Sequence, residues 1–175
     1  MPNVSDAYEP STSASSSVPL TIRLDDLSDP RIAEFMKEHL ADMRATSPPE
    51  SVHALDLERL RQPDIRFFSL WLCEGTPGEQ LVGTGALKRL DAQHGELKSM
   101  RTRASVRRQG LGRRLLQHLL TEARSMDLSR LSLETGTEPY FAAASALYEA
   151  HGFVDCAPFA DYRLDPHSRY MTLAL

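Results

Sequence analysis

Three apolar runs lie close together between residues 65 and 102, and the connections between them are too short to hold a helix. The runs are Ile65–Cys73, Leu81–Leu90 and Gly95–Thr102, and they are joined through Glu74–Glu79 and Asp91–His94. Parallel neighbours need a connection of a dozen or more residues, whereas antiparallel strands can be joined by a tight turn. We therefore expect three consecutive strands in an antiparallel meander.

Helix and strand patterns flank this meander on both sides. A strand at 20–24 precedes a helix that Asp29 caps, with Pro30 at its first position. Leucines at helical spacing predict a further helix from Leu111 to about residue 126. The other expected elements are a helix at about 52–61, a strand at 130–135, a helix at about 139–150, and strands at 153–156 and 170–175. This order predicts a mixed α/β (α+β) fold, a mainly antiparallel central sheet with helices on both faces.

Composition separates a tail from one domain. Residues 1–19 are rich in Ser, Thr, Ala and Pro, which bury too little apolar surface to offset the cost of ordering, so we expect a disordered N-terminal tail. Residues 20–175 fit a single domain. No run of 18 apolar residues is present, and the acidic N-terminus is unlike a signal peptide. We therefore expect a cytoplasmic protein with no membrane partner, in which Cys73 and Cys156 are packed, reduced thiols.

Positive charge is concentrated in one segment. Residues 101–114 hold six of the 20 Lys and Arg residues and no acidic residue, although the chain as a whole has 24 Asp and Glu and a net charge of -4. This pattern predicts a local anion site. It argues against nucleic-acid binding, because the segment also lacks aromatic residues for base stacking. The six histidines show no metal-ligand spacing, so no metal is expected.

The segment Arg107–Arg113 has the properties of a diphosphate-binding loop. It opens the leucine-lined helix, where unpaired backbone N–H groups and the helix dipole favour an anion. Gly110 and Gly112 have no Cβ, so the backbone can approach a phosphate closely. A P-loop would need Lys followed by Ser or Thr after the second glycine, but Arg113 and Arg114 stand there. A dinucleotide-binding fold would need a third glycine where this chain has Leu115, so the residues exclude both alternatives.

The pattern Arg107-x-x-Gly110-x-Gly112 resembles the pyrophosphate loop of the GNAT superfamily, the acetyl-CoA-dependent N-acetyltransferases. The preceding strand, residues 96–102, resembles the fourth strand of that family, and residues 147–153 resemble its Leu-Tyr-x-x-x-Gly-Phe segment. The resemblance spans about residues 20–175 and implies a GNAT-like fold with acetyl-CoA as co-substrate. The cofactor-binding residues that it implies are Met100, Arg101 and Thr102 on the strand and Arg107, Arg108, Gln109, Gly110, Leu111, Gly112 and Arg113 on the loop.

The resemblance also implies catalytic residues. Tyr148 falls on the tyrosine that lies near the thioester sulfur in the family, and Glu96 has the spacing at which some members carry a glutamate base. Glu134 on the next strand is a further candidate base, because an alkylammonium must lose a proton before it attacks a thioester. Many members carry Asn about seven residues before the tyrosine. This chain has Phe141 there, which leaves the pantetheine contact of that Asn open.

The implied reaction transfers acetyl from acetyl-CoA to a primary amine of a small molecule, by direct attack in a ternary complex and without an acyl-enzyme. Positioning, amine deprotonation and protonation of the leaving thiol would supply the catalysis. Two alternatives stay open: a non-catalytic acyl-CoA-binding regulatory module, and acetylation of a protein amine. A homodimer is also left open.

Arg101 provides a hypothesis about the charge of the acceptor. Members of the family usually carry an aromatic or aliphatic side chain at this position. Strand parity alone would place Arg101 and Glu96 on opposite faces. The fourth strand of the family is usually bulged, however, and the resemblance therefore implies one extra residue that brings them to the same face, where the Arg101 guanidinium could bind a carboxylate or phosphate of the acceptor. In the alternative interpretation Arg101 belongs to the phosphate-binding cluster or is solvated.

Overall fold

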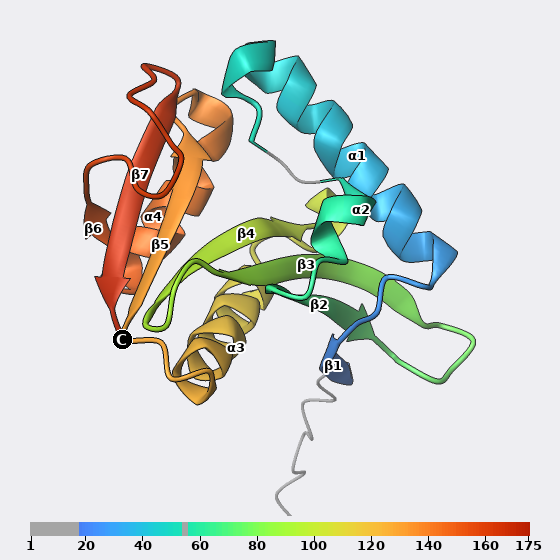
Figure 1. The fold of residues 1–175 in the computed structure, drawn as a ribbon. Helices are drawn as coiled ribbons and strands as arrows, with labels where there is room; N and C mark the ends of the chain where they lie inside the picture. The colour runs from blue at the N-terminus through green and yellow to red at the C-terminus, as the bar shows by residue number, and fades with distance from the viewer. Residues whose placement is uncertain (1–17, 54–55) are drawn as a thin grey trace, which may run out of the picture.

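The structure is a computed structural model that describes residues 18–53 and 56–175, so the expected disordered tail falls almost wholly outside the described residues. The described chain forms one sheet with helices on both sides, the predicted fold class (Figure 1). The helices are α1 (Pro30–Thr46), α2 (Leu57–Leu60), α3 (Leu111–Ser125) and α4 (Ala142–Ala150). The strands are β1 (Leu20–Leu24), β2 (Ile65–Leu72), β3 (Gln80–Arg89), β4 (His94–Thr102), β5 (Arg130–Gly136), β6 (Val154–Asp155) and β7 (Ser168–Ala174).

The sheet has the strand order β1-β2-β3-β4-β5-β7-β6. The meander β2-β3-β4 is antiparallel, as predicted, and β4 and β5 form the parallel pair. That pairing joins only residues 94–97 to residues 130–133. Beyond it the two strands diverge, and Figure 1 shows the half of the sheet with β5 and β7 turned away from the half with β2, β3 and β4. The sheet is therefore split open beside the C-terminal half of β4.

Each face of the sheet has its own apolar core. On one face α1 and α2 cover β2 and β3, with Phe35 and Trp71 fully buried. On the opposite face α3 and α4 pack against the strands through residues that include Leu115, Leu119 and Tyr148. The leucine stripe predicted for α3 is the stripe that is buried. Helix positions are thus set by apolar periodicity on both faces.

A bulge interrupts β4, as the family resemblance of this strand implies. Lys98 pairs with Ala86 on β3, whereas Arg101 pairs with Thr84, so β4 has one extra residue in this interval. Ser99 within it has a φ of 53°. Residues paired across a ladder lie on the same face of a sheet, and Ala86 belongs to the core beneath α1. Glu96, Lys98 and Arg101 therefore all lie on the face that α1 covers.

Three element boundaries differ from the prediction. The helix expected at 52–61 is reduced to the single turn of α2, capped by the Asp56 carboxylate, with a 3-10 turn (Pro49–Ser51) before it; residues 54–55 lie outside the described chain. The helix expected from residue 139 begins as a 3-10 turn (Pro139–Phe141). The strand expected at 153–156 is only two residues long, and Pro158 soon after it cannot donate a ladder hydrogen bond.

Leu119 is a sensitive test of this packing. It is fully buried on α3, and Gly85 of β3 leaves the space that its side chain fills, because a Cβ at Gly85 would lie 2.6 Å from Leu119 Cδ1. Leu119→Ala should lower the free energy of unfolding by about 2–5 kcal/mol. Urea denaturation measures the change, with Gln117→Ala on the exposed face of the same helix as a control near zero. A loss below 1 kcal/mol for Leu119→Ala would contradict the packing.

Candidate active site

The loop before α3 presents backbone N–H groups with no helical acceptor. Arg108 and Gly110 both have positive φ, 65° and 75°, and Gly110 is the residue before the first turn of α3. The first helical bond runs from the Arg114 N–H to the Gly110 carbonyl, so the N–H groups of residues 111–113 precede it. No side chain caps this end of α3, and its first turn holds no acid. An anion would find both hydrogen bonds and a favourable dipole here.

The first turn of α3 lies where the split sheet opens. A Cβ placed on Gly112 would lie 3.5 Å from Leu147 of α4 and 4.0 Å from Thr102 at the end of β4. The loop, the C-terminal end of β4 and α4 therefore meet at one place. The structure thus brings the predicted loop residues next to the predicted strand residues and next to α4, which carries Tyr148.

Tyr148 is buried, with 7% of its surface exposed, and its ring lies 5.7 Å from that of Phe153 between centroids. Burial, with the charge of Glu134 as a smaller cause, raises the pKa of the Tyr148 phenol above its ordinary value. The hydroxyl therefore stays protonated at neutral pH and is available as a hydrogen-bond donor.

Glu134 lies on β5 at the first position beyond the β4–β5 pairing. Ser132, two residues earlier on β5, pairs with Glu96. Side chains two residues apart on a strand lie on the same face, so Glu134 lies on the same face as Glu96. The Ser168 hydroxyl donates a hydrogen bond to Glu134 Oε1 at 2.6 Å. Burial raises the pKa of Glu134 to about 7, against the lowering effects of Ser168 and Lys98. A carboxyl group with this pKa can exchange a proton at neutral pH.

Glu96 is more deeply buried, with 3% of its surface exposed, and both its partners bind the same carboxylate oxygen. Lys98 Nζ donates to Glu96 Oε1 at 2.8 Å, and the Tyr162 hydroxyl donates to the same oxygen at 2.6 Å. Lys98 Nζ also donates to Tyr162 Oη at 2.7 Å. Glu96 is therefore a charge-compensated carboxylate, although its sequence position is that of a candidate base.

A large cleft of about 1220 Å³ opens above Glu96 on the α1 face. Its floor is formed by His94, Glu96 and Lys98. Its walls come from residues 50–53 and Arg59 on one side, from residues 64 and 88–91 at the strand ends, and from residues 160–167 of the β6–β7 connection on the other. A cleft of this size suits a small-molecule acceptor.

Sequence reasoning did not identify Lys98 and Tyr162 as site residues. Lys98 follows Glu96 by two residues on the same strand, and this spacing could have placed the two side chains on one face. Tyr162 carries no such signal, because it comes from a connection 66 residues further along the chain. Its ring lies 4.9 Å from that of His53 and 5.1 Å from that of Phe159 between centroids, which seats the connection on the cleft wall.

The predicted role of Arg101 in binding an anionic acceptor group is not supported. The bulge does bring Arg101 to the face of Glu96, but Arg101 does not line the cleft. Its Nη2 instead lies 3.0 Å from Asp42 Oδ2 and 3.7 Å from Glu38 Oε2, both on α1. The guanidinium is thus neutralised by acids that are far away in the sequence, and it lies beneath α1.

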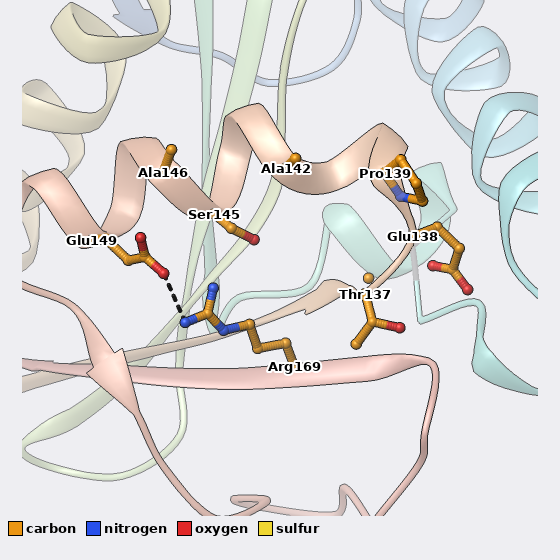
Figure 2. Close-up of a pocket in the computed structure, with 9 residues that line it drawn as sticks. Thr137, Glu138, Pro139, Ala142, Ser145, Ala146, Glu149 and Arg169 are labelled. Carbon is orange, nitrogen blue, oxygen red and sulfur yellow. Dashed lines mark ion pairs between the residues drawn. The ribbon is translucent and has the colours of Figure 1, made fainter.

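Figure 2 shows a second, smaller pocket of about 420 Å³ beside α4. Thr137, Ser145 and Arg169 are among the residues that line it, and Arg169 forms an ion pair with Glu149 at 2.8 Å. None of the predicted catalytic residues lines this pocket. Glu96 lines the larger cleft, whereas Glu134 and Tyr148 lie on the elements beside the opening of the sheet, so the candidate active site is assigned to that opening together with the larger cleft.

Within residues 18–53 and 56–175, no group of three or more His, Cys, Asp or Glu side chains could hold a metal ion. No described helix has both the length and the hydropathy needed to cross a membrane.

Comparisons with known proteins agree with the resemblance in the sequence. The model of the acetyltransferase (GNAT) family matches residues 32–153. The Escherichia coli (strain K12) protein YedL, named an uncharacterized N-acetyltransferase, is 52% identical over 155 residues, which cover 89% of this chain and 94% of YedL.

Solved structures give the same result. A Klebsiella pneumoniae protein described as an acyl-CoA N-acyltransferase is 29% identical, with a TM-score of 0.74 over 89% of this chain and 97% of that one. A Bacillus subtilis acetyltransferase solved in complex with CoA is 16% identical, with a TM-score of 0.62 over 90% of this chain and 99% of that one. The chain therefore belongs to the GNAT family of acetyl-CoA-dependent N-acetyltransferases.

Proposed function

We propose that the protein transfers acetyl from acetyl-CoA to a primary amine of a small molecule, by direct attack in a ternary complex. The observation that carries the proposal is that three groups come from elements that meet at the opening of the sheet: the amides before α3, a partly buried carboxyl with a pKa of about 7 at Glu134 on β5, and the Tyr148 hydroxyl on α4. Each supplies one requirement of the reaction: binding, proton acceptance and leaving-group stabilisation.

Acetyl-CoA would lie along the split between β4 and β5. Beyond residue 97, β4 has no ladder partner on β5, so the backbone of Met100, Arg101 and Thr102 can pair with the amides of the pantetheine arm. The pyrophosphate would bind the amides of residues 108–113, with Arg107, Arg108 and Arg113 as counter-charges. Phe141 packs against Gly136 instead of contacting the cofactor through an amide side chain.

Glu134 is the base that the environment favours. Glu96 Oε1 already accepts hydrogen bonds from the Lys98 ammonium and the Tyr162 phenol, so this oxygen is occupied and is not free to bind an acceptor amine. Among the described residues Glu134 forms no ion pair, and its carboxylate accepts a hydrogen bond from the neutral Ser168 hydroxyl. It would take the proton of the amine, directly or through a water, as the new C–N bond forms.

Tyr148 would donate a hydrogen bond to the sulfur as the C–S bond breaks. Burial raises the pKa of the Tyr148 phenol, so the hydroxyl holds its proton firmly. Its hydrogen bond would therefore stabilise the leaving thiolate without full transfer of the proton. Neither Cys73, which follows β2, nor Cys156, which follows β6, lies on the elements that meet at the opening of the sheet, which favours direct attack over an acyl-enzyme.

The acceptor would enter through the large cleft, which has walls on several sides and so favours a small amine over a protein amine. An anionic group on the acceptor would find Lys88 there, which pairs across the ladder with Glu96 and so lies on the same face. Thiol release from acetyl-CoA, measured with a panel of small amines and with lysine-containing peptides, tests this choice. Turnover only with peptides would favour the protein-amine alternative, and CoA binding without any turnover would favour the regulatory module.

Gly110→Val should weaken CoA binding by about tenfold or more. A β-branched residue resists the positive φ of Gly110, at a cost of about 1–2 kcal/mol, and its side chain occupies the space of the phosphate. Isothermal titration with CoA measures the effect. Gly75→Val is the matched control, because Gly75 has a φ of 76°, is equally open, and lies in the turn between β2 and β3. Loss of affinity in both variants, or in neither, would contradict the loop assignment.

Glu134→Gln should lower kcat by about 10²- to 10⁴-fold. Glu134 accepts a proton only when ionised, so kcat/KM of the parent should rise with pH through about 7, and this limb should vanish in the variant. The pH dependence of kcat/KM is the measurement, with Glu96→Gln as the comparison that keeps the limb. If Glu96→Gln loses the limb and Glu134→Gln keeps it, the base is Glu96.

Tyr148→Phe removes the hydroxyl and keeps the buried ring. We expect kcat to fall by about 10- to 150-fold, the equivalent of a hydrogen bond to a charged group, with KM for acetyl-CoA close to that of the parent. Steady-state kinetics tests this against Tyr140→Phe, an exposed tyrosine. Equal activity of the parent and Tyr148→Phe would leave Tyr148 with a packing role only.

A further inference from the structure

Lys98 and Glu134 occupy equivalent positions on the two sides of the split. The last residues that pair across β4 and β5 are Leu97 and Leu133, and Lys98 and Glu134 follow them directly. Both lie on the α1 face, and Lys98 acts on Glu134 electrostatically. Opposite charges on neighbouring strands attract each other. Among the described residues, however, the ion pair recorded for Lys98 is with Glu96.

Two hydrogen-bond acceptors hold Lys98 on the side of Glu96. Its ammonium donates to Glu96 Oε1 at 2.8 Å and to Tyr162 Oη at 2.7 Å. Tyr162 in turn donates to the same Glu96 oxygen at 2.6 Å, so the three groups form a closed triangle. The triangle is shielded from water, with 10% of the Lys98 and 4% of the Glu96 side chain exposed. Hydrogen bonds to charged groups are strong in such surroundings.

Tyr162 reaches this triangle from outside the strand pair. It comes from the β6–β7 connection, its ring packs edge-on against His53 and Phe159, and Lys98 Nζ lies 5.3 Å from its ring centroid. Burial and the charge of Glu96 raise the pKa of the Tyr162 phenol, so the hydroxyl remains a donor to Glu96 and an acceptor for Lys98. The connection therefore determines where the Lys98 ammonium lies.

We propose that Tyr162 is a positioning residue that, together with Glu96, holds the Lys98 ammonium away from Glu134 and so leaves the Glu134 carboxylate free to take a proton from the acceptor amine. The proposal rests on the proposed role of Glu134. It assigns Glu96 to the support of the base, and it gives the β6–β7 connection a part in the chemistry besides forming a wall of the cleft.

The charged and titratable groups that act on Glu134 come from every element around it. Lys98 and Glu96 come from β4, Tyr148 from α4, Tyr162 and Asp165 from the β6–β7 connection, and Tyr170 from β7. Lys98 is the cation in this set. A displacement of its ammonium should therefore change the protonation of Glu134.

The test measures the protonation of Glu134 directly. In protein labelled with ¹³C-glutamate, the side-chain carboxyl signal of Glu134, assigned by its loss in Glu134→Gln, is followed as the pH is varied. Tyr162→Phe should lower the pKa of Glu134 by about one unit or more, because Lys98 loses an acceptor and turns to Glu134. Lys98→Met should raise the pKa of Glu134, because the only cation of the set is removed. Tyr140→Phe should leave it unchanged.

The same variants are then assayed. The acid limb of kcat/KM should move to lower pH in Tyr162→Phe and to higher pH in Lys98→Met, whereas a purely structural role would lower the rate without moving the limb. An unchanged or raised Glu134 pKa in Tyr162→Phe overturns the proposal, as does a lowered one in Lys98→Met. Should Glu134→Gln retain parental activity, the proposed base is wrong, yet the carboxyl titration still decides where Tyr162 holds Lys98.

Discussion

The short parallel ladder between β4 and β5 is the constraint on which the site depends. Parallel neighbours need a crossover, and the α3 helix supplies it, so its N-terminal turn must lie at the C-terminal end of β4. The ladder stops after four residue pairs, and from there each strand turns its backbone edge to the gap. A ligand with both amide and phosphate groups can then satisfy backbone groups that the sheet and the helix leave unpaired.

The same interruption gives two carboxylates on one face different chemistry. Glu96 lies within the paired region, beside a lysine and a phenol that compensate its charge. Glu134 lies just past it, where burial is less well compensated and the hydroxyl of Ser168 is the hydrogen-bonding partner. Residue type and strand position are nearly the same for the two. Their environments separate a charged support from a group that can exchange protons.

Sequence patterns predicted the features of the fold that depend on residues close together in the chain. Short connections determined the meander, the leucine spacing determined α3, and the glycine loop determined where the free amides lie. Contacts between distant segments were not predictable in this way. Asp42 on α1 neutralises Arg101 across 59 residues of chain, and Tyr162 reaches Glu96 from a connection with no regular pattern. Even the bulge, which the family resemblance implied, determines only the face on which Arg101 lies, and not the acid that binds it.

The place of the β6–β7 connection has a consequence for how such an enzyme can diversify. The connection joins an edge strand of two residues to its neighbour, so insertions and replacements within it leave the ladder of the central strands intact. Its residues 160–167 form a wall of the large cleft. Remodelling this one surface segment would therefore change the shape of the cleft, provided that a hydrogen-bonding partner for Lys98 is kept at the position of Tyr162.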